Sequence, residues 1–142
     1  MRLDDCFKKR LLRTDKPDIL KSKKALEMAN LKIERAGELI ESGFYEESIV
    51  SSYTGMFHSA RALLFKDGIT ERSHACVIAY LSKEYGQSLG QDRISWLDTY
   101  RLERHELFYG LEASGMDKYE SKDALSKAEK FLESVKNIIN DG

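Results

Sequence analysis

The chain has 142 residues, of which 42% are hydrophobic and 33% are charged, and 23 basic residues against 24 acidic ones give a net charge of −1. This length fits one domain, so we expect residues 1–142 to form a single unit with its core at about 18–140. The balanced charge excludes a protein that holds nucleic acid by overall positive charge, and any contact with RNA must come from a local basic patch.

The cellular location of the protein can be predicted from three features, namely its N-terminal segment, its apolar runs and its cysteines. No apolar run approaches the roughly 20 residues of a membrane span, so we expect no membrane contact. Residues 1–5 (MRLDD) are not followed by the apolar stretch of a signal peptide. Cys6 and Cys76 form neither a CxxC pair nor a metal-ligand spacing. We therefore expect a cytoplasmic protein with both cysteines reduced.

The apolar residues recur with helical spacing nearly throughout, and Pro17 is the only proline. Gly43 and Gly68 stand where two helices are expected to end, and Ser73 stands where another is expected to begin. No segment shows the alternation of a strand. We expect helices at about 3–12, 18–41, 45–67, 74–85, 92–111 and 121–140, with a loop at 86–90. The predicted fold is all-α, an antiparallel up-and-down bundle of four to five helices.

The helix predicted at 92–111 has an arginine in its apolar seam. The seam steps through positions 97, 100, 104, 107 and 111, and position 104 is Arg. A buried guanidinium needs a carboxylate, a carbonyl or a ligand, so Arg104 is a candidate binding residue. Arg101 and His105 share its helix face. Such a face could bind phosphate through two arginines and move protons through the imidazole, or it could be an exposed face of paired charges.

The helix predicted at 45–67 adds three candidates to the same site. Tyr53 lies on the apolar face, and its hydroxyl needs a partner when buried. His58 and Arg61 are three residues apart and could join Arg104. His74, beside the expected start of a helix, is interpreted as a surface residue. The histidines lack a metal-ligand spacing and no phosphate-binding glycine loop occurs, so we expect no metal and no cofactor.

The order of these segments resembles the HEPN domain family. The resemblance rests on YEESI and YTGMFHSARALL within residues 45–64, on RLERHELFYG at 101–110, and on a closing helix at 121–139. It covers about residues 20–140. It implies an antiparallel helical bundle that forms a homodimer and commonly pairs with a minimal nucleotidyltransferase, as in toxin–antitoxin modules.

The resemblance also bears on catalysis, because other HEPN proteins are metal-independent ribonucleases or toxins. These members use an Arg, a polar residue beside it and a downstream His, which Arg104, His105 and Tyr109 match in position. Tyr, with an ordinary pKa of about 10, is a poor base near pH 7. We therefore expect a non-catalytic subunit that binds a nucleotide or an RNA phosphate through Arg101, Arg104, His105, Tyr109, Tyr53, His58 and Arg61.

Two alternatives remain open at this point. The first is a metal-independent ribonuclease or toxin with a rearranged site, built from Arg104 and His105 with His58 or Tyr109. The second is a structural homodimer that has lost ligand binding.

Overall fold

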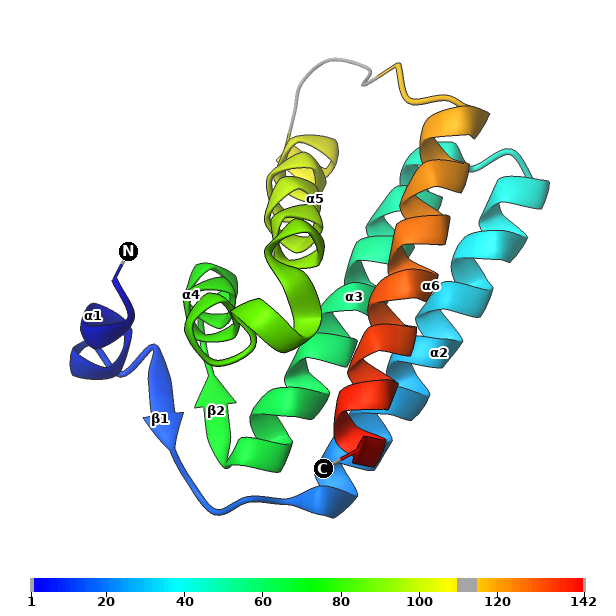
Figure 1. Ribbon diagram of the computed structural model, residues 1–142. Helices are drawn as coiled ribbons and strands as arrows, with labels where there is room; N and C mark the ends of the chain where they lie inside the picture. Colours follow the sequence, from blue (N-terminus) through cyan, green and yellow to red (C-terminus); the bar gives the residue numbers. More distant parts are fainter. Residues whose placement is uncertain (1, 110–114, 142) are drawn as a thin grey trace.

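The computed structural model describes residues 2–109 and 115–141, with side chains at all of these positions except 108, 109 and 141. The described chain is an all-α bundle with one small two-stranded sheet, which confirms the predicted fold class (Figure 1). None of the described helices is long and apolar enough to cross a membrane. The elements are α1 (Leu3–Lys8), β1 (Leu12–Thr14), α2 (Ile19–Glu41), α3 (Tyr45–Asp67), β2 (Ile69–Glu71), α4 (His74–Glu84), the π-helical turn η1 (Gly86–Gly90), α5 (Gln91–Tyr109) and α6 (Lys118–Asp141).

Helix α3 lies at the centre of the molecule. Figure 1 shows α2, α3 and α6 side by side, with α4 and α5 on the other side of α3. Capping residues define where α2 and α4 begin and where α3 ends. The Asp18 side chain accepts from Lys21 N at the start of α2, and Ser73 caps α4 in the same way at Cys76 N. Gly68 ends α3 with φ at 78°, the left-handed conformation that favours glycine.

Three serine side chains join α2 to α3. The Ser48 hydroxyl donates to the Ala36 carbonyl at 2.8 Å. Ser22 Oγ donates to the Ala62 carbonyl at 2.8 Å, and Ser51 Oγ to the Lys32 carbonyl at 2.7 Å, so these bonds run along the length of the pair. Because each buried hydroxyl reaches a carbonyl on the opposite helix, the two backbones must lie close together.

Gly55 permits this approach at the middle of α3. A Cβ atom at position 55 would lie 2.7 Å from Ile33 Cγ1 and 3.3 Å from the Ala29 carbonyl oxygen. The first distance is shorter than side chains tolerate. Glycine is therefore required here by the space between the helices, not by the backbone conformation.

One contact holds α5 against α6. The Lys127 ammonium bonds Asp123 at 2.8 Å and lies 5.9 Å from the centre of the Trp96 ring. On the α5 side, the Arg93 guanidinium lies 5.4 Å from the same ring. The indole thus lies close to two cations, one from each helix.

The N-terminal segment differs most from the prediction. The expected helix at 3–12 ends at Lys8, and residues 12–14 instead pair with β2 in antiparallel register, Leu12 opposite Glu71. A strand of three residues is too short to show alternation in the sequence. The expected loop at 86–90 is a π-helical turn, and α6 begins three residues earlier than expected, with Asp117 accepting from Glu120 N.

The expectation of two reduced cysteines was wrong for this structure. Cys6 and Cys76 form a disulfide between α1 and α4, with both residues buried and their Cα atoms 5.8 Å apart. The residues are separated by 70 positions, so their spacing gave no sign of the pairing. The β1–β2 pairing is the physical reason, because it brings the N-terminal segment beside the start of α4.

The close packing at Gly55 leads to a stability prediction. Gly55→Ala should lower the free energy of unfolding by about 1–3 kcal/mol, because the added methyl group collides with Ile33. Gly37→Ala is the matched control, since a Cβ there meets only Leu125 Cδ2 at 3.9 Å, and it should raise stability by up to about 1 kcal/mol through helix propensity. Urea unfolding monitored by circular dichroism measures both. Equal effects of the two changes would contradict the packing explanation.

The disulfide leads to a second prediction. Reduction, or the Cys6→Ser/Cys76→Ser variant, should lower the free energy of unfolding by about 2–4 kcal/mol, because a cross-link across 70 positions restricts the unfolded chain. Urea unfolding with and without reductant measures the change, and the double variant should not respond to reductant. Two free thiols per chain, titrated in denaturant without reductant, would show that the cross-link does not form.

Candidate functional site

A hydrogen bond between Tyr53 and His74 lies at the centre of the candidate site. The Tyr53 side chain on α3 is buried, and its hydroxyl lies 2.6 Å from His74 Nδ1. The imidazole of His74, the first residue of α4, also stacks on the Phe57 ring with centroids 3.8 Å apart. The Ser73 cap fixes the start of the same helix. These contacts hold one imidazole at a defined place between α3 and α4.

The protonation states of this pair follow from burial and from nearby arginines. Burial lowers the pKa of His74 most, and together with the positive charges of Arg104, Arg101 and Arg61, in that order, it brings this pKa to about 4. Burial raises the pKa of Tyr53 well above its ordinary value. At neutral pH the phenol and the imidazole are therefore both uncharged, and in the tautomer in which the phenol donates to Nδ1 the ring proton lies on Nε2.

Arg104 and Arg101 on α5 add positive charge to this pair. The half-buried Arg104 has its guanidinium 5.9 Å from the centre of the Tyr53 ring, which places the residue against α3. Arg101 bonds Asp98 Oδ1 through two nitrogens, at 2.9 and 3.0 Å. We call Tyr53, His74, Arg101 and Arg104 the Tyr53–His74 cluster.

Arg61 and His58 form a second group one to two turns further along α3. Arg61 Nε lies 2.9 Å from Glu71 Oε1 on β2, and Arg61 Nη1 lies 3.5 Å from His58 Nδ1. Burial, followed by the charges of Arg61 and Lys32, lowers the pKa of His58. Arg61 is thus already engaged with a carboxylate and ties α3 to the β1–β2 ribbon.

The structure brings together part of the predicted residue set. Tyr53, Arg101 and Arg104 converge, while His58 and Arg61 form the neighbouring group around Glu71. His105 is exposed on α5. The predicted role of Tyr109 rests on a side chain outside the described residues.

Sequence reasoning missed His74 and Phe57. His74 was interpreted as a surface residue, and it is instead half-buried against α3. Two signals could have found it. Tyr53 on an apolar face needed a hydroxyl partner, and the Ser73 cap placed a titratable residue at the very start of α4.

The described residues include no group of three His, Cys, Asp or Glu side chains placed to hold a metal ion. The chemistry available to the Tyr53–His74 cluster itself is the binding of anions. Guanidinium groups bind phosphate or carboxylate through paired hydrogen bonds, and the Nε2 proton of a neutral imidazole can donate one more.

Comparison with known proteins identifies a family and two relatives. The HEPN domain family matches residues 22–138. A "UPF0332 protein" of Archaeoglobus fulgidus is 33% identical over 123 residues, which cover 78% of this chain and 94% of that protein. "Putative toxin MJ0605" of Methanocaldococcus jannaschii is 24% identical over 127 residues, covering 82% of this chain and 87% of that protein.

The helices and the cluster define a small helical-bundle protein with a positively charged site between α3, α4 and α5. The chain belongs to the HEPN domain family, as the resemblance of residues 45–64 and 101–110 predicted.

The low pKa of His74 gives a prediction. We expect its imidazole signal, followed by NMR, to titrate near pH 4, and Arg104→Gln to raise this pKa because one neighbouring positive charge is lost. Arg35→Gln, which removes an exposed charge on α2 that does not act on His74, is the control and should leave the pKa of His74 unchanged. An ordinary pKa near 6.5 in the wild type would contradict the prediction.

The same shift sets the sign of a pH effect on stability. The pKa of His74 in the folded protein, about 4, lies below that of an unfolded histidine, about 6.5, so the unfolded chain binds more protons in this interval. The contribution of His74 to stability is complete above pH 6.5 and is lost as the pH falls toward 4. In urea unfolding, His74→Gln should remove this part of the pH dependence.

Proposed function

We propose that this chain is a non-catalytic HEPN subunit that binds the phosphate of a nucleotide or RNA at the Tyr53–His74 cluster and pairs with a small nucleotidyltransferase. The observation that carries the proposal is the neutral imidazole of His74, held by Tyr53 beside the two arginines of α5. Binding of a phosphate there would be stabilised by the positive charge of the arginines, because charges interact more strongly in a poorly solvated site. The name of the M. jannaschii relative supports a role in a toxin–antitoxin pair.

We further propose a homodimer with the α5 helices near a two-fold axis. Leu102, an apolar residue on α5, is 55% exposed, and His105 is exposed on the same helix. A two-fold axis at α5 would cover Leu102 and bring two Tyr53–His74 clusters near each other. The paired clusters would then form one extended site for a phosphate-bearing ligand.

Ribonuclease activity is the second candidate function. In its favour, His74 is unprotonated at neutral pH and lies beside arginines. Against it, a group with a pKa of about 4 takes up a proton weakly at pH 7, and Tyr109 stands where the cleaving family members carry His. We therefore expect metal-independent cleavage to be weak or absent.

The test compares the wild type with Arg104→Lys, measured as binding of labelled RNA and ATP by fluorescence anisotropy. Binding should weaken about ten- to a hundredfold, because lysine cannot make the two-pronged contact of a guanidinium. Arg35→Lys is the matched control, since Arg35 lies exposed on α2, and it should bind as the wild type does. Sedimentation of the same samples should give twice the mass of one chain.

Three results distinguish the binding proposal from ribonuclease activity. Unchanged binding in Arg104→Lys, with an unchanged melting temperature, would contradict the binding proposal. Brisk RNA cleavage by the wild type in chelator, abolished in Arg104→Lys, would favour the ribonuclease. Cleavage gained by Tyr109→His alone would show that the missing base had prevented it. Co-expression with a minimal nucleotidyltransferase from the neighbouring reading frame, followed by co-purification, tests the pairing.

A further inference from the structure

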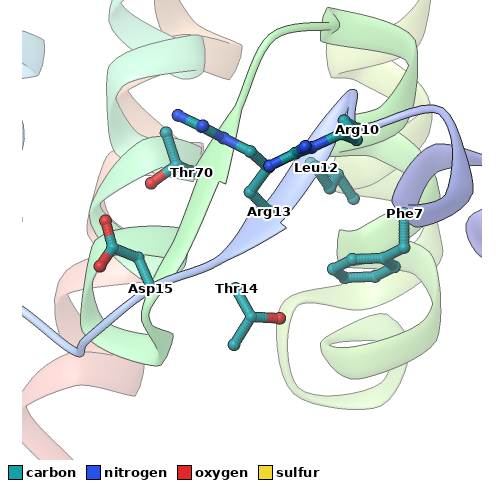
Figure 2. A pocket seen from close by; sticks show the side chains of 7 residues that line it. All are labelled: Phe7, Arg10, Leu12, Arg13, Thr14, Asp15 and Thr70. Carbon is teal, nitrogen blue, oxygen red and sulfur yellow. The ribbon is translucent and has the colours of Figure 1, made fainter.

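An open hollow of about 520 Å³ lies beside the β1–β2 ribbon, and none of its lining residues belongs to the Tyr53–His74 cluster. Figure 2 shows the side chains that line it, with those of two arginines extending across the ribbon. All of its lining residues except Thr70 precede residues 22–138, which match the HEPN family, so most of the hollow lies outside that match. The residues that line the hollow include Phe7, Arg10, Arg13, Thr14, Asp15 and Thr70.

The β1–β2 pairing determines the direction of the Arg13 side chain. Arg13 pairs in register with Thr70, so the two side chains lie on one face of the ribbon. The opposite face buries Leu12 and Ile69 in the core. Arg13 and the Thr70 hydroxyl are therefore turned away from the core, and both reach the hollow.

An unusual backbone conformation places Arg10. Its φ is 58°, and it is the one non-glycine residue with positive φ in the described chain. Hydrogen bonds from Arg10 N to the Phe7 carbonyl, 3.1 Å, and from Leu11 N to the Cys6 carbonyl, 2.8 Å, hold this turn. The disulfide at Cys6 anchors the same turn to α4. These two hydrogen bonds and the disulfide hold the Arg10 backbone in its left-handed conformation. They thereby fix the point from which the Arg10 side chain extends.

The charges in the hollow favour an anion. Among the described residues, neither Arg10 nor Arg13 forms an ion pair. Asp15 is the one carboxylate in the lining, and its Oδ1 accepts from Lys16 N at 2.8 Å. Two guanidiniums and one carboxylate leave a net positive charge, and the Thr70 hydroxyl, which shares the ribbon face of Arg13, can donate a further hydrogen bond.

The hollow is also close to the proposed RNA site along the chain. Thr70 and His74 are four residues apart, so their Cα atoms are separated by at most about 14 Å even if that segment is fully extended. One short RNA strand can span such a distance.

We propose that Arg10 and Arg13 form a second phosphate site, which takes a backbone phosphate of the same RNA strand that binds at the Tyr53–His74 cluster. The identity of the ligand, RNA, rests on the proposed function, whereas the location of the site rests on the hollow. Thr70, on the same face of the ribbon as Arg13, would donate to a remaining phosphate oxygen, and Phe7 would border the site on its apolar side.

The test uses the full-length, oxidised protein and the variant Arg10→Asn/Arg13→Gln. Asn is tolerated in the left-handed conformation and Gln is a neutral replacement in the strand, so the variant should fold. Binding of a labelled single-stranded RNA of about 12 nucleotides is measured in chelator between about 50 and 200 mM salt. We expect the Kd to rise about tenfold and the slope of log K against log salt to become shallower by about 0.7, the value for one phosphate on a single strand.

Lys8→Gln/Lys9→Gln is the matched control. It removes the same charge from the same segment, but neither lysine lines the hollow. This variant should keep the salt slope of the wild type. An equal loss of affinity and slope in both double variants would overturn the proposal, because a general charge effect would then explain it. Unchanged RNA binding in Arg10→Asn/Arg13→Gln would overturn it as well.

A separate measurement distinguishes failure of this proposal from failure of the proposed function. If the wild type binds no RNA, the function assigned to the Tyr53–His74 cluster and the RNA ligand of the hollow both fail. Titration with inorganic phosphate, followed through the Nε–H signals of Arg10 and Arg13, then decides whether the hollow binds phosphate at all. Saturable shifts of both signals would support a phosphate site, and unmoved signals would overturn it.

Discussion

The close contact between α2 and α3 is the constraint on which the rest of the molecule depends. Gly55 and the serine hydroxyls at positions 22, 48 and 51 commit one side of α3 to α2. The opposite side, which carries Tyr53 and Phe57, must then be covered by other elements, and α4 and α5 provide the cover. A looser contact with α2 would shift the helix whose Tyr53 and Phe57 side chains contact His74 and Arg104.

The site that results combines a neutral base with positive charge. Burial, followed by the charges of the arginines, keeps His74 unprotonated, and the hydrogen bond with Tyr53 holds its imidazole in place. A bound anion would weaken the field of those arginines, so the pKa of His74 would rise when the site is filled. Ligand binding and proton uptake are in this way linked at a single imidazole.

The sequence predicted the parts of the fold that depend on local chemistry. The ends of α3 and α4 followed from Gly68 and Ser73, and the interruption of an apolar seam singled out Arg104. Contacts between distant residues could not be predicted in this way. The Tyr53–His74 bond spans 21 positions and the Cys6–Cys76 bond spans 70, and both depend on how β1, β2 and α4 meet. The position of Arg10 escaped prediction for the same reason, since its turn is fixed by contacts with α1.

The placement of Trp96 close to both Arg93 and Lys127 has an optical consequence. It is the only tryptophan in the chain, so the ultraviolet emission of the whole protein originates at the contact of α5 with α6. Nearby cations alter the excited state of an indole, and a small displacement of either helix would change the colour and intensity of the light. Because α5 also carries Arg101 and Arg104, the protein contains its own unlabelled reporter of movement in the helix next to the candidate site.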